Sequence, residues 1–168
     1  MVMRIIISED QLDVMKSKLK GIIDAEGLID AANILDIPIY RLIEMGVVES
    51  YDGNLDLRGT PIKSLGNLKY IGGDLNLYKT TLESLGKLES VKGDFYLDSS
   101  PLESLGNLKS VGGYLSLSNS QIKSLGDLES VGSDLYLDNT PIEEELKENG
   151  MSDDDIKNKF GVKGDLYI

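Results

Sequence analysis

The sequence contains neither cysteine nor histidine among its 168 residues. Without cysteine, disulfide bonds and thiol nucleophiles are excluded. Without histidine, the chain lacks the commonest general base and the commonest ligand of transition metals. The Gly-x-Ser-x-Gly elbow, the P-loop and the dinucleotide-binding fingerprint are absent as well. We therefore expect a protein that is not an enzyme and that has no cofactor and no metal site.

Basic residues are scarce relative to acidic ones. There are 17 lysines and arginines against 29 aspartates and glutamates, which gives a net charge of -12. The excess is even, because residues 1–50, 51–142 and 143–168 each carry four more acids than bases. No section offers the basic stripe that phosphate neutralisation requires. We expect neither nucleic acid nor an anionic membrane to be a direct ligand.

Long apolar runs are missing too. No stretch approaches the length needed to span a bilayer. The opening segment, Met1 to Ile7, is too short for the apolar core of a secretory signal, and Glu9 and Asp10 follow it at once. Hydrophobic residues still make up 40% of the chain, enough for a packed core. We expect a folded, cytoplasmic protein.

What the sequence does have is a motif that recurs every twenty residues. One part is Gly-Asp-Leu-x-Leu or a close variant, at Gly73–Leu77, Gly93–Leu97, Gly113–Leu117 and Ser133–Leu137. The other is Ser-Leu-Gly, starting at Ser64, Ser84, Ser104 and Ser124. A fixed period of this length predicts a solenoid, in which each repeat forms one coil. Solenoids generally present binding surfaces, so the period also favours a binding module.

Apolar residues fill the same positions of each repeat. The first position of the Leu-x-Leu pair is Leu55, Leu75, Phe95, Leu115, Leu135 and Leu166. Both apolar residues of the pair fall on one face of a strand, because side chains alternate along it. Stacking of the coils would turn this face into a continuous core and the strands into a parallel sheet.

The two ends depart from the repeat. Residues 1–50 predict an N-terminal helical cap: a strand at Met3–Ile7, a capping box at Ser8–Gln11, and helical spacing at 12–23, 28–35 and 39–45. Residues 28–45 also admit a helix-turn-helix, but Arg41 is the only base of its second helix, so we expect packing. Residues 51–168 form the solenoid, with two short helices inserted at about 143–160 and a terminal strand at 164–168.

Charged residues also form columns. Lys69, Glu89, Lys109 and Glu129 alternate in sign from coil to coil, whereas Lys63, Glu83, Glu103 and Lys123 alternate only in part. Opposite charges on adjacent rungs favour the correct register, although each exposed pair contributes little. We expect these columns to form a solvated face rather than a binding site.

The segment Leu75-x-Leu77-x-x-Thr80-x-Leu82 resembles the signature half of leucine-rich repeats, Leu-x-Leu-x-x-Asn-x-Leu. The resemblance covers residues 54–142 and, less fully, 162–168. The Val-x-Gly-Asp step is similar to the variant in receptor L-type domains. Hydroxyl residues replace the family's asparagine, at Thr60, Thr80, Ser100, Ser120 and Thr140. The resemblance implies a mainly β fold, a right-handed leucine-rich-repeat-like solenoid with one parallel sheet.

A looser resemblance concerns origin. The phrases Ser-Leu-Gly-Asn-Leu and Val-Gly-Gly, with the opening Met-Arg-Ile-Ile-Ile-Ser-Glu-Asp, are similar to repeat proteins of tailed bacteriophages. This resemblance implies a phage-encoded protein that acts on a host protein inside the cell, or that belongs to the virion.

Tyrosines gather on the outward positions of the predicted strands. Leucine-rich repeats bind ligands through this face, and exposed tyrosine flanked by small polar residues is a frequent composition of binding hot spots. The alternative is that tyrosine simply favours strands. The candidate partner-binding residues are Asn76, Tyr78, Tyr96, Asp98, Tyr114, Tyr136, Asp138 and Tyr167.

A column of carboxylates runs beside the strands, at Asp74, Asp94, Asp134 and Asp165. Stacked carboxylates could bind Ca²⁺, but the repeat lacks the denser Gly/Asp pattern of calcium-binding β-rolls. The alternative is that these aspartates accept hydrogen bonds from backbone N–H groups at the glycine corner, as aspartate does in turns. We expect the second arrangement.

We therefore expect a non-enzymatic module that binds an unidentified protein partner through the tyrosine-bearing strand face. Two other functions remain open. The strand at 164–168 could pair with a second copy and build a structural homo-oligomer. The acidic surface could instead mimic DNA and inhibit a DNA-binding protein, although lysines interrupt the acidic columns.

Overall fold

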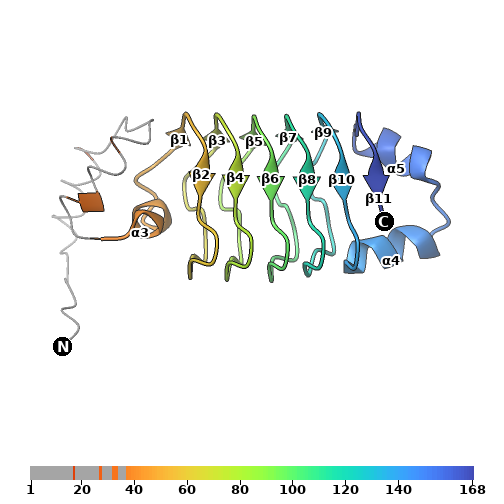
Figure 1. Cartoon of the computed structure of the whole chain (residues 1–168), viewed down its shortest axis with the longest axis horizontal. Helices are drawn as coiled ribbons and strands as arrows, with labels where there is room; N and C mark the ends of the chain where they lie inside the picture. The colour runs from red at the N-terminus through yellow and green to blue at the C-terminus, as the bar shows by residue number, and fades with distance from the viewer. Residues whose placement is uncertain (1–16, 18–26, 28–31, 34–36) are drawn as a thin grey trace.

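The computed structural model describes residues 17, 27, 32–33 and 37–168 (Figure 1). The predicted strand at 3–7, capping box at 8–11 and helix at 12–23, and most of the helix at 28–35, lie outside the described residues. The described chain winds into a parallel β-solenoid with a twenty-residue period. The prediction of a mainly β solenoid with short helices is confirmed.

Each coil contributes one strand to each of two parallel sheets. The predicted Leu-x-Leu strands form a six-stranded sheet, ordered β11-β10-β8-β6-β4-β2. Its strands are β2 (Leu55–Asp56), β4 (Leu75–Asn76), β6 (Phe95–Tyr96), β8 (Leu115–Ser116), β10 (Leu135–Tyr136) and β11 (Leu166–Tyr167). In the sequence we expected this one sheet only.

A second sheet has five strands in the order β1-β3-β5-β7-β9. Each of its strands ends two residues before the position that is Gly53, Gly73, Gly93 or Gly113 in the first four coils. Its strands are β1 (Ser50–Tyr51), β3 (Tyr70–Ile71), β5 (Ser90–Val91), β7 (Ser110–Val111) and β9 (Ser130–Val131). Each strand buries one apolar residue and leaves the other half-buried. Each strand is only two residues long, too short to show an alternation of apolar and polar residues in the sequence. For this reason the sequence did not predict this sheet.

The twenty-residue stacking is visible in the register. Leu75 pairs with Phe95, and Phe95 pairs with Leu115 on the next rung. All three side chains are fully buried and belong to one hydrophobic cluster that runs the length of the solenoid. The predicted apolar columns therefore form the shared interior.

A tight turn follows β2, β4, β6, β8 and β10 of the six-stranded sheet. The second residue of this turn has a positive φ, near +55°, although it is not a glycine in most coils; Lys79 and Ser99 are examples. The hydroxyl residue that comes next is buried in most coils, and the Thr80 hydroxyl donates to the Leu77 carbonyl 2.9 Å away. These hydroxyls bond within their own coil, unlike a ladder that links neighbouring coils. The hydroxyl of Ser120 is buried and has no partner among the described residues.

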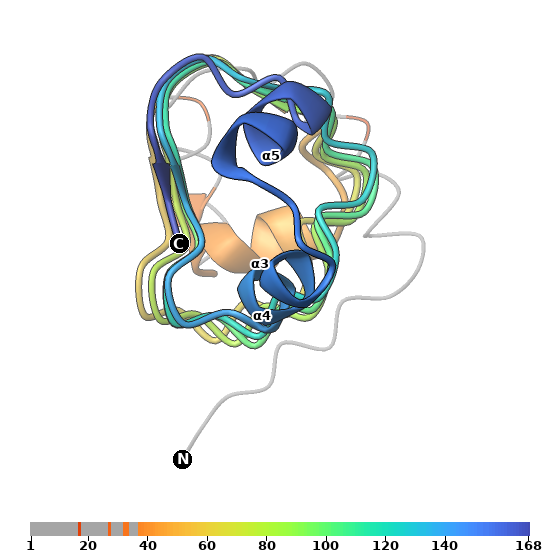
Figure 2. The same ribbon diagram turned by 90° about the vertical axis from the view of Figure 1, so that its right-hand side faces the viewer.

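Helices cover both ends of the core. At one end α3 (Ile39–Glu44) buries Leu42 and Ile43, as the helical spacing predicted. At the other end lie α4 (Pro141–Glu148) and α5 (Asp153–Lys159), the two short helices expected in the insertion. Figure 2 shows α4 and α5 across the end of the superposed coils. Whether residues 1–50 form a separate unit stays a prediction, although the first solenoid strand, β1, starts at Ser50.

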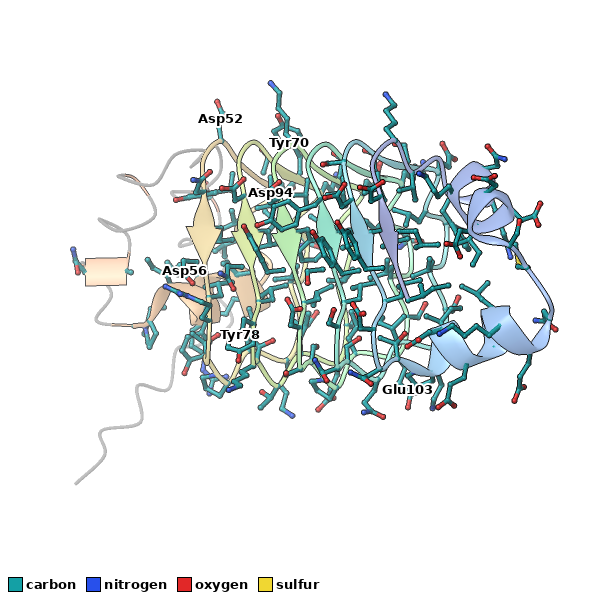
Figure 3. The ribbon with its side chains drawn as sticks, turned by 45° about the vertical axis from the view of Figure 1, so that its right-hand side comes forward. Asp52, Asp56, Tyr70, Tyr78, Asp94 and Glu103 are labelled. Carbon is teal, nitrogen blue, oxygen red and sulfur yellow. The ribbon has the colours of Figure 1, made fainter. Side chains whose placement is uncertain are left out.

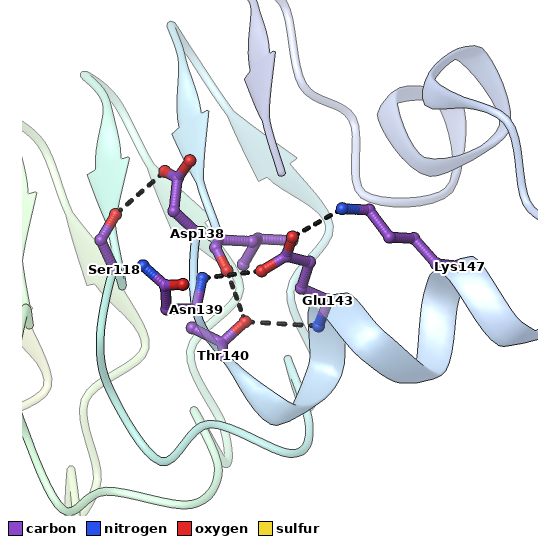
Figure 4. Close-up of polar contacts among 7 residues, drawn as sticks. Ser118, Asp138, Asn139, Thr140, Glu143 and Lys147 are labelled. Atoms are coloured by element: carbon purple, nitrogen blue, oxygen red, sulfur yellow. Dashed lines mark hydrogen bonds and ion pairs between the residues drawn. The ribbon is translucent and has the colours of Figure 1, made fainter.

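The repeat array ends at Thr140, which is the N-cap of α4. In the preceding coils the residue at this position ends the turn. Thr140 holds the Leu137 carbonyl like its counterparts, but its Oγ1 also accepts from the N–H of Glu143, 3.3 Å away (Figure 4). The Glu143 carboxylate accepts from the Asn139 N–H at 2.7 Å and from Lys147 Nζ at 2.6 Å. Pro141 follows as the first residue of the helix, a position where its missing N–H costs nothing.

Candidate binding surface

The residues predicted to bind a partner lie on the outer face of the six-stranded sheet and on the turns that border it. On each strand the residue between the two buried apolar positions points outward, as for Asn76, Tyr96 and Tyr136. Tyr78 and Tyr167 are the large apolar side chains most exposed in the described chain, at 38% and 41%. The structure therefore places the predicted residues on one continuous surface.

Four tyrosines form a single contact chain on this surface, which we call the tyrosine row: Tyr96, Tyr114, Tyr136 and Tyr167. The rings of Tyr96 and Tyr114 meet edge to face with centroids 5.1 Å apart, and their hydroxyls are hydrogen-bonded. Tyr114 meets Tyr136 edge to face at 6.2 Å, and Tyr136 stacks on Tyr167 at 4.4 Å. Such ring pairs fix one another's orientation, so the row is a preorganised aromatic surface.

Tyr78 lies apart from the row. Lys79 Nζ lies 4.9 Å from the centre of its ring, and Figure 3 shows it on the lower turns of the coils. Asn76 accepts a hydrogen bond from the N–H of Tyr78 at 3.1 Å. These two predicted residues are thus engaged in local contacts, and the structure does not bring them into the tyrosine row.

The aspartate column caps backbone donors, as expected. The Asp74 carboxylate accepts from the N–H of Asp94 at 2.9 Å, and the Asp94 carboxylate accepts from the N–H of Tyr114 at 3.1 Å. Asp134 does the same for Asp165 at 2.8 Å. Asp74, Asp94 and Asp134 therefore each tie their coil to the next one. Among the described residues, no cluster of three or more His, Cys, Asp or Glu side chains is arranged to hold a metal ion.

The tyrosine row is bordered by carboxylates on the same face. Asp98 accepts from the Ser116 hydroxyl at 2.5 Å, and Asp138 accepts from the Ser118 hydroxyl at 3.2 Å. On the other side stand the aspartates of the capping column, with Asp94 above the strands in Figure 3. Serine hydroxyls hold the first two carboxylates in place, so carboxylates border the tyrosine row on both sides.

At the start of the sheet the acidic face is interrupted by one ion pair. Arg58 Nη2 lies 2.7 Å from the Asp56 carboxylate, and both side chains are exposed. The hydrogen bond from Arg58 lowers the pKa of Asp56, so this carboxylate stays charged at neutral pH. The pair lies at the end of β2, away from the tyrosine row, and the ion pairs found among the described residues do not include Asp94, Asp98, Asp134 or Asp138.

The contact between Tyr96 and Tyr114 predicts a pH effect. The hydrogen bond from Tyr114, then burial and the nearby carboxylates, raises the pKa of Tyr96 above its usual value. A group whose pKa is raised on folding stabilises the fold below its unfolded pKa, about 10, and this contribution is lost as pH rises further. We expect the stability of the wild type to fall as the pH rises above about 10, and that of Tyr96→Phe to fall less. Urea unfolding across this range checks the prediction, and equal losses in both proteins would contradict it.

Two grooves lie on other sides of the described coils. One, of about 320 Å³, follows the outer side of the five-stranded sheet over Ser90, Ser110 and Ser130. The other, of about 480 Å³, lies between two coils at Ser84 and Ser104, on a side away from the tyrosine row. Neither holds a set of side chains arranged for catalysis, so the tyrosine row remains the strongest candidate site among the described residues.

The part of the chain that the structure describes contains no helix with the length and apolar composition needed to cross a membrane. Comparisons with protein-family models, with curated proteins and with solved structures found no match to this chain.

Proposed function

We propose that this protein is a non-enzymatic binding module that captures a protein partner through the tyrosine row. The observation that carries the proposal is the unbroken contact of four tyrosines over one parallel sheet. Tyrosine buries a large area on binding at a low entropic cost, and clustered tyrosines are typical of interface hot spots. A scaffold that already holds its rings in place loses little freedom when a partner binds.

The border of carboxylates indicates the chemistry of that partner. Asp94, Asp98, Asp134 and Asp138 flank the row, and the whole chain carries a net charge of -12. A complementary surface would present lysine or arginine, which can pair with the carboxylates and lie over tyrosine rings. We propose a basic protein surface as the partner.

We also propose that the chain is a leucine-rich-repeat-like protein encoded by a bacteriophage. The repeat phrases and the parallel stacking of the coils support the first part, and the phrasing similar to phage repeat proteins supports the second. On this proposal the protein acts on a host protein in the cytoplasm or forms part of the virion. DNA mimicry is less favoured, because lysines are interspersed among the acidic residues of the repeat columns.

Self-association stays a separate hypothesis. β11 pairs with β10 on one side, and its Tyr167 is exposed, so its outer edge could accept a strand from a second copy. Sedimentation at high protein concentration tests it, and a monomer there would contradict it.

Removal of two members of the row should abolish capture of the partner. Truncating a hot-spot tyrosine costs about 2 kcal/mol or more, so Tyr96→Ala with Tyr136→Ala should weaken binding at least about 100-fold. The assay is affinity capture from extract of the native host with quantitative mass spectrometry, followed by a binding titration with the protein that is captured.

The matched control is Tyr70→Ser on β3. Tyr70 occupies the position that is serine in the next three coils of the five-stranded sheet, so the fold tolerates this change. We expect the control to capture the partner like wild type, and thermal unfolding should show both variants folded. Undiminished capture by the folded double variant would contradict the proposal.

A further inference from the structure

The Ser-Leu-Gly phrases stack along a third side of the solenoid, which we call the serine edge: residues 63–67, 83–87, 103–107 and 123–127. Where the first two of these segments meet, the backbones pair as in a sheet. The N–H groups of Glu83 and Ser84 donate to the Lys63 carbonyl at 2.9 and 3.2 Å, and the N–H of Lys87 donates to the Gly66 carbonyl at 3.1 Å. Ser64 and Ser84 form a parallel bridge.

The last two segments pair in the same way. The N–H groups of Lys123 and Ser124 donate to the Glu103 carbonyl at 2.9 and 3.2 Å, and that of Asp127 donates to the Gly106 carbonyl at 2.9 Å. Ser104 and Ser124 form the corresponding parallel bridge. The serine edge is therefore built as two pairs of rungs.

Between the two pairs these hydrogen bonds are missing, and we call this junction the seam. The N–H groups of Glu103, Ser104 and Asn107 find no acceptor in the preceding coil, unlike their counterparts at both other junctions. The N–H of Leu85 and the carbonyls of Glu83 and Gly86 are likewise without protein partners in the described structure. Backbone groups of this kind must be satisfied by water or by a ligand.

The seam is also physically wider than its neighbours. A Cβ built on Gly86 or Gly126 would lie 2.3 Å from the carbonyl oxygen of the glycine one coil before it. A Cβ built on Gly106 would meet nothing within 4 Å. The groove of about 480 Å³ opens here, lined by Ser84, Leu85, Gly86, Pro101, Glu103 and Ser104. The two sheets stay paired across the same junction, so only the serine edge is open.

Two like charges face each other where the coils part. Lys63 Nζ lies 2.5 Å from the Glu83 carboxylate, and Lys123 Nζ lies 2.7 Å from the Glu103 carboxylate. Within the column of Lys63, Glu83, Glu103 and Lys123, only the seam brings two like charges together, those of Glu83 and Glu103, which disfavours close approach. Pro101 has no N–H to donate, and the N–H of Leu102 turns to the Ser100 hydroxyl of its own coil. Along the column the charges run Lys63, Glu83, Glu103 and Lys123, so one cation between the two glutamates would make them alternate in sign.

We propose that the seam binds an extended, basic peptide segment of a partner protein, inserted parallel to the coils as an additional rung. Its backbone would accept from the N–H groups of Glu103, Ser104 and Asn107 and donate to the carbonyls of Glu83 and Gly86. A lysine or arginine would lie between the two glutamates and complete the alternation of charge. Strand addition to unpaired backbone edges is a common mode of peptide recognition, here with an edge on both sides.

The peptide must carry a small residue on its inner side. Leu85 is 4% exposed and forms the floor of the groove, so the core offers no room for a further leucine. The inference is independent of the tyrosine row, since the groove and the row share no residue.

Two synthetic peptides test the site. The first, acetyl-Lys-Ser-Ala-Gly-Asn-amide, copies residues 63–67 with alanine for the inner leucine. The second replaces its lysine with glutamate. In a titration of the ¹⁵N-labelled protein to millimolar peptide, we expect the lysine peptide to shift the amide signals of Leu85, Glu103, Ser104 and Asn107. The glutamate peptide should bind at least about fivefold more weakly, the effect of one favourable and one unfavourable charge contact.

A charge swap should close the site. Glu103→Lys with Lys123→Glu makes the column alternate fully at an unchanged net charge, so the seam should close and the peptide shifts should vanish. The amides of residues 103, 104 and 107 should then exchange more slowly with solvent. Glu103→Lys alone, which places a cation opposite Glu83, serves if the swap fails to fold. Tyr96→Ala with Tyr136→Ala should leave peptide binding unchanged, which separates this site from the tyrosine row.

Three results would overturn the proposal. They are the absence of seam shifts at millimolar lysine peptide, equal binding of the two peptides, and undiminished binding by a folded variant whose charge column alternates.

Discussion

Gly126→Ala should destabilise the solenoid by roughly 2–5 kcal/mol, the sum of a left-handed backbone penalty and a steric clash. Gly126 has a φ of +57°, and a Cβ there would lie 2.3 Å from the carbonyl oxygen of Gly106 and 2.8 Å from its nitrogen. Backbone atoms cannot move aside as a flexible side chain can. The coils would have to separate and break the Asp127 hydrogen bond to Gly106.

Gly106→Ala is the matched comparison. It stands in the same Ser-Leu-Gly phrase with nearly the same φ, +55°, but its Cβ would enter open space. Only the backbone penalty of about 1–2 kcal/mol applies. Urea unfolding of the two variants measures the difference directly. Equal destabilisation would mean that the coils at the seam lie as close together as those at Gly126, which contradicts the open seam.

The interior of this protein could be predicted from the sequence because each core position recurs. The column that contains Leu75, Phe95 and Leu115 has a fixed spacing and is apolar throughout, which leaves one register that buries it. The helices were predictable for local reasons, such as the Ser152 hydroxyl that caps α5 with Asp155. The repeat and the helix caps both depend on residues that are close together in the sequence, so the sequence alone reveals them.

The second sheet and the seam could not be predicted, because they depend on backbone positions in neighbouring coils. Ser90–Val91 shows a single apolar residue, too little to reveal a strand. The like charges of Glu83 and Glu103 were visible in the sequence, but the pattern alone did not show that the backbone opens there. A charge column of exposed residues normally alters stability too little to affect the fold.

The tyrosine row was predictable in part. The outward positions of Tyr96, Tyr136 and Tyr167 follow from strand alternation. Tyr114 was also expected to face outward, but it occupies a position that is aspartate in the coils on either side. Its hydroxyl reaches Tyr96 and its ring reaches Tyr136, so it joins side chains that the spacing alone left separate.

Phe95→Ala should cost about 3–5 kcal/mol and should also divide the solenoid into two unfolding units. Phe95 is fully buried on β6 and pairs with Leu75 across the junction that carries the seam. This junction already lacks the serine-edge hydrogen bonds, so it depends on the two sheets and on the core. In a stack of repeats, cooperativity is carried by the interfaces between neighbours. Weakening the least bonded interface should uncouple the coils on its two sides.

Two controls isolate this effect. Phe95→Leu restores the residue found in the neighbouring coils and should cost less than about 1.5 kcal/mol. Leu115→Ala empties the same column one junction further on, where the serine edge is paired, and should lower stability with one cooperative transition. Urea unfolding followed by circular dichroism should give a reduced m-value or two steps for Phe95→Ala alone, because each unit exposes less surface than the whole. An m-value equal to that of wild type would show that the seam does not weaken the coupling between coils.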